Sequence, residues 1–286
     1  MNRAPILASL LAISLAVSSA CTPTPQAGTG SWASVRVANL APDLAAIDFC
    51  FAAQGTGNFL GPQMLAKGET GGLQYANPAR QVGWYGLLLT GTWVVRIVPA
   101  GAADCAGAIV PDATISLSEG VSYTVAVTGL ATSTTAPHST YTWTDDTLVP
   151  SGQVWVRFVN AAMASATSGS APLDAGTGAP AAFRPLFRNV LFPGPAAPSA
   201  TVNANGYASL APGDLAVGTT TVTACLSGVA PGPATCPVSS AWGGPPMPAL
   251  YAGTLFAVGG TPTAPWRMLT CLDNVPGPVL NYSWCL

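Results

Sequence analysis

The chain has very few charged residues. Its 286 residues include nine lysines and arginines and eleven aspartates and glutamates, so charged residues make up 7% of the sequence, where about a quarter is usual. Lys67 is the only lysine, and the arginines form no cluster. Because binding to nucleic acid depends on clustered positive charge, we expect no nucleic-acid partner. A hydrophobic fraction of 49% argues against a disordered chain.

Little material is present for catalysis at neutral pH. Acid–base and nucleophilic chemistry relies on histidine, cysteine thiolate, lysine or paired carboxylates, and the one histidine, His138, lies in a segment expected to be an exposed loop. The pairs Asp43 with Asp48 and Asp145 with Asp146 could bind Ca²⁺ or act as a glycosidase pair. We interpret the region of Asp43 as a turn between strands and Asp145-Asp146 as a solvated segment. The sequence predicts a protein with no enzymatic activity, cofactor or metal site.

Long hydrophobic runs are scarce, and the one near the N-terminus precedes a cysteine. Arg3 is followed by the apolar stretch 6–17, and the small residues 18–20 then lead to Cys21. This order is typical of a signal peptide, which we place at residues 1–20. The apolar run 87–98 is too short to span a membrane. We therefore expect an exported protein.

Cys21 is the expected site of lipidation. A lipid on this residue would anchor the chain to a membrane without a spanning helix, and residues 21–31 would then comprise the anchor and a flexible tether. Ordinary cleavage, which would release a soluble secreted protein, is the alternative. With the lipid, the expected location is the cell envelope, at the outer membrane or the cell surface.

Six of the seven cysteines remain to form disulfides, which suits an oxidising compartment. A zinc site is disfavoured because no C-x-x-C spacing occurs. The two cysteines of the first part of the chain can pair only with each other if they pair within it, whereas the four of the second part allow three connectivities. We favour the pairs Cys50–Cys105, Cys225–Cys236 and Cys271–Cys285.

An internal repeat indicates two domains. The segment 35–39 (VRVAN) recurs as 156–160 (VRFVN), and each copy later has a second apolar strand, at 122–129 and 253–259, and then an acidic position. Apolar residues alternate along these segments, as in half-buried strands. The sequence predicts an all-β chain of two tandem antiparallel β-sandwiches of about seven strands each, at 32–149 and 152–286.

The opening of the first repeat resembles a known family. The segment 34–51 (SVRVANLAPDLAAIDFCF) is similar to the opening of bacterial secreted domains of unknown function, whose signature includes Arg36, Asn39, Pro42, Asp43 and Asp48 at these positions. The resemblance implies an immunoglobulin-like or transthyretin-like sandwich, a tandem arrangement, export and no assigned activity. The second repeat departs from the pattern, since its acidic position returns only at residue 174.

Two functional hypotheses follow. In the first, the protein is a structural or adhesive module of the cell surface that binds envelope or extracellular proteins. In the second, it is a carbohydrate-binding module in which exposed aromatic rings stack on sugars. The candidate ligand-facing residues are Trp84 and Tyr85, with Trp93, Trp143 and Trp242 as further aromatic candidates. Solvent exposure of these rings distinguishes the two hypotheses.

Overall fold

The computed structural model describes residues 30–63, 71–75, 81–83, 85–163, 172–216, 218–242, 247, 249–274 and 284–285. The expected signal peptide, Cys21 and nearly all of the tether lie outside this range, as does Trp84. The described residues are almost entirely strands and loops, with one 3-10 turn at Pro180–Ala182. Within the described ranges, no helix combines the length and hydrophobicity that crossing a bilayer requires.

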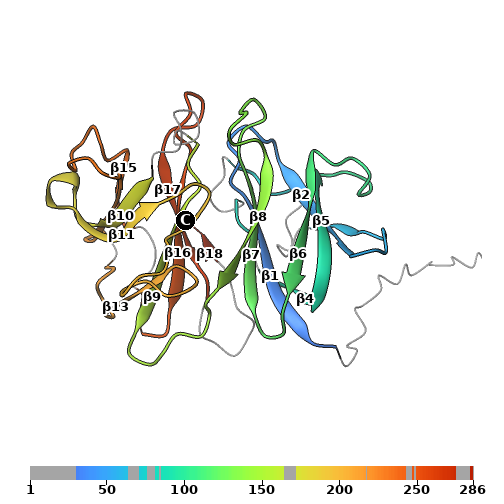
Figure 1. Cartoon of the computed structure of the whole chain (residues 1–286), viewed down its shortest axis with the longest axis horizontal. Helices are drawn as coiled ribbons and strands as arrows, with labels where there is room; N and C mark the ends of the chain where they lie inside the picture. Colours follow the sequence, from blue (N-terminus) through green and yellow to red (C-terminus); the bar gives the residue numbers. More distant parts are fainter. Residues whose placement is uncertain are drawn as a thin grey trace, which may run out of the picture. The chain divides into compact units, whose positions relative to one another are not determined.

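The first half of the described chain, residues 32–145, forms two sheets (Figure 1). The strand orders are β4-β1-β7-β8 and β3-β2-β5-β6. The strands are β1 (Trp32–Asn39), β2 (Ile47–Ala53), β3 (Leu60–Gln63), β4 (Gly86–Leu89), β5 (Gly91–Pro99), β6 (Val110–Leu117), β7 (Ser122–Thr128) and β8 (Ser139–Asp145).

The second half, residues 154–285, also forms two sheets, with orders β12-β9-β16-β17-β18 (β13 also pairing with β9) and β11-β10-β14-β15. Its strands are β9 (Val154–Asn160), β10 (Leu173–Thr177), β11 (Arg184–Val190), β12 (Gly194–Pro195), β13 (Tyr207–Leu210), β14 (Thr221–Leu226), β15 (Val238–Ala241), β16 (Ala252–Val258), β17 (Arg267–Leu272) and β18 (Trp284–Cys285).

Each half contains one parallel strand pair, which the expectation of purely antiparallel sheets missed. β1 runs parallel to β7, and β9 runs parallel to β16 in the same relation. Most of the strands between the two partners belong to the half's other sheet. A parallel pair needs a long connection, and this excursion supplies it. The remaining ladders are antiparallel, and the chain passes between the halves through residues 146–153, which contain no strand.

Three apolar clusters account for most of the core. One fills the space between the two sheets of the first half and another does so in the second half. A third joins the halves, because it combines residues of β1, β7 and β8 with residues of β9, β16 and β17. The central sheets are therefore buried on both faces. Along β1, Val35 and Val37 enter the core of the first half, whereas Ala38, on the other face, enters the shared cluster.

Disulfides and turns anchor the loops. Cys50 on β2 is bonded to Cys105, and Cys225 is bonded to Cys236, as the favoured pairings have it. Cys271 is also disulfide-bonded and lies opposite Cys285 in the register of β17 and β18. The side chain of Cys285 is outside the described residues.

The Asn that ends each repeated strand makes the same turn. Asn39 accepts a hydrogen bond from the backbone N–H of Ala41 at 3.3 Å, and Asn160 accepts one from Ala162 at 3.2 Å. Each amide group then donates to a backbone carbonyl of a distant loop or strand end. These contacts are typical of Asx turns, so the repeat in the sequence corresponds to a repeated local structure.

Candidate functional site

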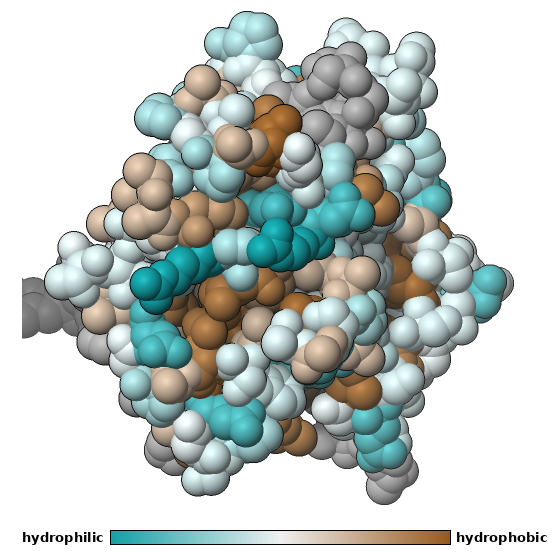
Figure 2. Space-filling model, turned by 60° about the vertical axis from the view of Figure 1, so that its left-hand side comes forward, coloured by the Kyte–Doolittle hydropathy of each residue, from teal (hydrophilic) through white to brown (hydrophobic). Residues whose placement is uncertain are grey.

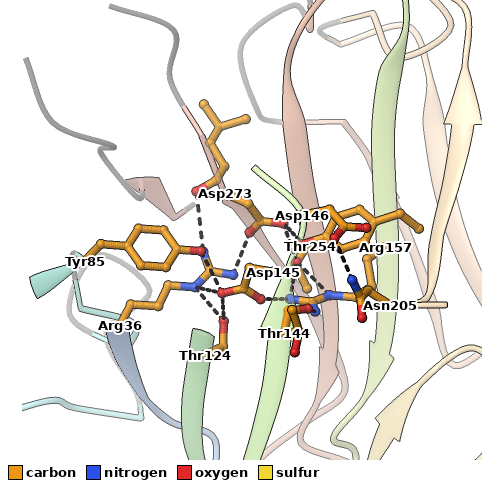
Figure 3. Close-up of polar contacts among 12 residues, drawn as sticks. Arg36, Tyr85, Thr124, Thr144, Asp145, Asp146, Arg157, Asn205, Thr254 and Asp273 are labelled. Carbon is orange, nitrogen blue, oxygen red and sulfur yellow. Dashed lines mark hydrogen bonds and ion pairs between the residues drawn. The ribbon is translucent and has the colours of Figure 1, made fainter. Parts of the chain in front are cut away.

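The two repeated arginines lie at the centre of the contact between the halves. Arg36 on β1 and Arg157 on β9 are fully buried, and each points away from the core of its own half toward the other half (Figure 3). Alternation explains this direction, since each arginine stands between two valines or a valine and a phenylalanine that fill its own core. The residues around them form a buried polar cluster, which we call the central network.

The first half contributes four residues to the central network. Arg36 donates from Nε to Thr124 Oγ1 at 2.7 Å, and that hydroxyl donates to Asp145 Oδ2 at 2.6 Å. The hydroxyl of Tyr85 also donates to Asp145 Oδ2, at 2.7 Å, while its ring centroid lies 5.1 Å from the Arg36 guanidinium carbon. Arg36 Nη2 then reaches across to Asp273 Oδ1 of the second half at 2.5 Å.

The second half repeats this arrangement with its own four residues. Arg157 donates from Nε to Thr254 Oγ1 at 3.1 Å, and that hydroxyl donates to Asp273 Oδ2 at 2.7 Å. Tyr207 donates to the same carboxylate oxygen at 2.6 Å and lies under the Arg157 guanidinium. Arg157 Nη2 crosses to Asp145 Oδ1 of the first half. Each arginine thus pairs with the aspartate of the opposite half.

The charges of the central network balance. Two guanidinium groups face two carboxylates, and each carboxylate accepts hydrogen bonds at both oxygens. Burial alone lowers the pKa of Arg36, but the carboxylate of Asp273 and neighbouring oxygens reverse this effect, so the net shift is upward. Burial alone raises the pKa of Asp145, but Arg157 and Arg36 outweigh it and hold this pKa below its usual value. Arg36 and Asp145 therefore stay charged at neutral pH.

The two tyrosines of the network stay protonated and act as donors. Burial raises the pKa of Tyr85 and of Tyr207 well above the usual value for a phenol. Each hydroxyl donates a hydrogen bond to a carboxylate of the network. The donors and acceptors of the central network are hydrogen-bonded to one another, so the network joins the two halves. It fixes the central sheets against each other.

Asp145 and Asp146, expected to be a solvated pair, lie in different environments. Asp145 is 3% exposed and belongs to the central network, so its solvated placement was wrong. Asp146 is half-buried and accepts hydrogen bonds from the side-chain amides of Asn203 and Asn205, each at 2.6 Å. Adjacent residues at a strand end point in opposite directions, which explains the separation. The sequence does not predict the burial of Asp145, because it does not show that the second half packs against this strand end.

The other carboxylate pair is also divided. Asp43 Oδ1 forms a short hydrogen bond of 2.6 Å with Nε2 of His138, and Asp43 Oδ2 accepts another from the N–H of Ala131. Asp48 is nearly buried and accepts from the N–H of Gly101 at 3.2 Å. His138 is not the exposed residue expected, since its side chain is 10% exposed. Among the described residues, no group of three or more potential metal ligands occurs.

The aromatic candidates that the structure describes do not form an exposed platform. Trp93, Trp143 and Trp242 are buried, with 8%, 7% and 2% of their surface exposed. Tyr85, expected to face a ligand, directs its hydroxyl inward to Asp145 instead. Its position beside Arg36 explains the difference, because a buried phenol needs an acceptor. Trp84 lies outside the described residues.

Three members of the central network escaped the sequence reading: Thr124, Thr254 and Tyr207. A signal for the two threonines was present. Each is the third residue of its strand, β7 or β16, and each is the register partner of the repeated arginine on the neighbouring parallel strand. Tyr207 carries no such signal, since β13 has no counterpart in the aligned segments.

No protein-family model matches the chain, and no curated protein matches it. Function is therefore inferred from the chain's own residues.

Proposed function

We propose that the protein is a non-catalytic lipoprotein of the cell envelope that serves as a structural or adhesive interaction module. Cys21 would carry the lipid, and residues up to 31 would tether the folded part to the outer membrane or the cell surface. The folded part would present loops and sheet edges to envelope or extracellular partners. Its disulfides support export, because such bonds persist in oxidising compartments.

We further propose that each half is an immunoglobulin-like or transthyretin-like sandwich of the secreted family that the opening segment resembles. Three matched features support this proposal. Each half has two sheets around a core of its own, each has a parallel pair that includes the repeated Arg strand, and each ends that strand on the same Asn turn. The two halves would then be the two tandem domains.

The central network is the observation that carries the interaction-module proposal. It uses both repeated arginines and both acidic positions to join the halves, and so it holds them in one orientation. A rigid pair of sandwiches presents a fixed surface, which lowers the entropy lost when a partner binds. Figure 2 shows apolar side chains lying open beside hydrophilic ones on one side of the molecule, and Leu191 is 60% exposed.

A carbohydrate-binding module is the second candidate. A sugar contact at Trp84 remains a prediction, and the buried rings of Trp93, Trp143 and Trp242 do not support sugar binding. One other feature does: the half-exposed indole of Trp155 borders two hollows whose walls are rich in hydroxyl and amide groups. Such walls and an aromatic ring are the groups that sugars require.

The envelope proposal is tested by the intact mass of the protein extracted from membranes, measured with and without reductant. We expect a mature chain that begins at Cys21 and carries the mass of a diacyl or triacyl group, and a gain of two hydrogens for each bridge on reduction. A Cys21→Ser variant should lose the lipid mass and leave the membrane fraction. An unmodified Cys21, or free thiols at the other six cysteines, would overturn the proposal.

A further inference from the structure

Trp155 stands between two hollows in the surface. It lies on β9, on the same strand face as Arg157, at the margin of the contact between the halves. The first hollow has a volume of about 310 Å³ and is lined by residues that include Ser122 and Thr144 of the first half and Thr147 of the connection between the halves. The second, of about 460 Å³, is lined by Ser199, Thr201 and other residues of the second half. These volumes are in the range of small-ligand sites.

Both hollows are lined by a mixture of apolar groups and polar side chains, and the polar side chains other than Asp145 and Asp146 are uncharged. Hydroxyl and amide side chains dominate the polar lining, and no lysine or arginine lines either hollow. The carboxylate of Asp145 is hydrogen-bonded within the central network, so Asp146 is the carboxylate available to a ligand in the first hollow. A ligand with negative charge would meet no cation there and one anion. The lining favours a neutral ligand with many hydroxyl groups.

The groups that would contact this ligand are held in place in advance. The indole of Trp155 donates from Nε1 to Gln153 Oε1 at 3.0 Å, and Gln153 Oε1 also accepts from Ser209 at 3.1 Å. The ring of Tyr207 packs at a tilt against Trp155, with centroids 6.3 Å apart. The indole is thereby fixed in one rotamer while part of it remains open to solvent.

Asp146 is also oriented. Its two carboxylate oxygens each accept one amide hydrogen bond, from Asn203 and Asn205 (Figure 3 shows the latter). The side chain of Asn203 is fixed as well, because its Oδ1 accepts hydrogen bonds from the backbone N–H groups of Asn205 and Tyr207, both at 3.0 Å. Each carboxylate oxygen keeps a further lone pair. Such a carboxylate can accept hydrogen bonds from two neighbouring sugar hydroxyls.

We infer that Trp155 and the two hollows beside it form a binding site for a neutral saccharide, with one sugar ring on the indole and hydroxyl groups directed to Asp146 and the hydroxyl-lined walls. The apolar C–H face of a sugar suits the electron-rich face of an indole. This inference rests on the second proposed function, a carbohydrate-binding module, and gives that function a site. It also moves the aromatic contact from Trp84 and Tyr85 to Trp155.

At the corresponding position of the repeat, the first half has no counterpart of Trp155. In the repeat, the position of Trp155 corresponds to Ser34, two residues before the arginine in each copy. Ser34 offers no ring for stacking. The central network is shared equally by the two halves, whereas the saccharide site distinguishes the second half from the first.

The test uses the detergent-solubilised full chain on an array of neutral glucan, chitin, mannan and galactan oligosaccharides together with sialylated and sulfated glycans. Titration calorimetry then gives the affinity for the neutral oligosaccharide that binds best. We expect Trp155→Ala to weaken this binding at least tenfold and Asn205→Ala, which releases one oxygen of Asp146, to weaken it severalfold. Trp32→Ala, another half-buried tryptophan that lines neither hollow, should leave it unchanged.

Each outcome decides the question. If Trp155→Ala does not fold, Trp155→Phe keeps an apolar ring but loses the bond to Gln153, and it should weaken binding less than tenfold. Silence across the array, binding restricted to anionic glycans, or neutral binding that survives both Trp155→Ala and Asn205→Ala would overturn the saccharide site. An acylated, disulfide-bonded chain that binds no glycan on the array would overturn the saccharide site and leave the envelope proposal intact. A chain without the lipid that binds neutral glycans through Trp155 would support the saccharide site and overturn the envelope proposal.

Discussion

Replacing Asp145 by Asn should destabilise the protein strongly. Asp145 accepts hydrogen bonds from Arg157, Thr124 and Tyr85, and Arg36 Nε lies 3.6 Å from its Oδ2. An amide has the same shape but no charge, and its NH₂ group would face donors instead of acceptors. The substitution leaves the central network with two arginines and one carboxylate, all buried.

The expected cost follows from this burial. Removing one partner of a buried ion pair costs about 3–5 kcal/mol, because the remaining charge stays desolvated. Single domains have unfolding free energies of about 5–15 kcal/mol, so the loss would be a large share of the total. The individual hydrogen bonds are not added to this figure, since contacts within one network are not independent.

Urea unfolding followed by tryptophan fluorescence measures this cost, and the chain offers a matched control. Asp112 forms a two-point ion pair with Arg96, at 2.9 and 2.6 Å, but both side chains are partly exposed. Asp112→Asn should therefore cost no more than about 1 kcal/mol. An Asp145→Asn and Arg157→Met double variant should be less destabilised than the sum of its single variants, because each single change leaves the other partner unpaired.

The reasoning would be refuted if Asp145→Asn cost no more than Asp112→Asn. Exact additivity of the double variant would also refute it, since a coupled pair cannot behave as two independent sites. We expect the wild type to unfold in one transition, because the central network and the shared apolar cluster couple the halves. Weakening this coupling through Asp145→Asn should favour two transitions.

Three further predictions concern pH, a disulfide and a glycine. The folded-state pKa of Asp145 is lowered, so its stabilising contribution is complete above its unfolded pKa of about 3.9 and is lost as pH falls through the folded value. As pH falls below about 4, the free energy of unfolding measured by urea titration should therefore decrease more steeply for the wild type than for Asp145→Asn. Replacing Cys50 and Cys105 by serine should cost about 4 kcal/mol for a 55-residue separation, against about 3 kcal/mol for the second bridge, which spans 11 residues, as measured by denaturant titration; equal costs would contradict the chain-entropy argument. Gly129 has φ +105°, and a Cβ there would lie 2.3 Å from the carbonyl oxygen of Pro137, so Gly129→Ala should lower the thermal midpoint further than Gly55→Ala, where no atom lies within 4 Å.

Local structure could be predicted from the sequence because it depends on neighbouring residues. The alternation of Val35 and Val37 around Arg36 specifies a strand and the two faces of that strand. Asn39 predicts a turn, since its side chain can bond the backbone two residues on. The repeat at residues 156–160 predicts the same local structure a second time. These inferences need no knowledge of distant parts of the chain.

The cysteine pairings lie between the local and the distant. With two cysteines in the first half, one intradomain pair is possible, so counting alone suggested Cys50 and Cys105. In the second half, counting left three connectivities open. The structure selects by proximity: Cys225 is bonded to Cys236, and the strand register places Cys271 opposite Cys285.

What the sequence by itself determined is the all-β character, the strands and turns, the repeat and the pairing of the first two cysteines. Only the tertiary structure decided what covers the second face of the strand that carries Arg36, and hence that Asp273 is its partner at a distance of 237 residues along the chain. Alternation divides a strand into two faces but does not say whether water or protein lies against them. From the sequence, Asp145 was therefore expected to be solvated, and Trp155 was one strand residue among many. The packing of the two halves places Asp145 inside their contact and Trp155 at its margin.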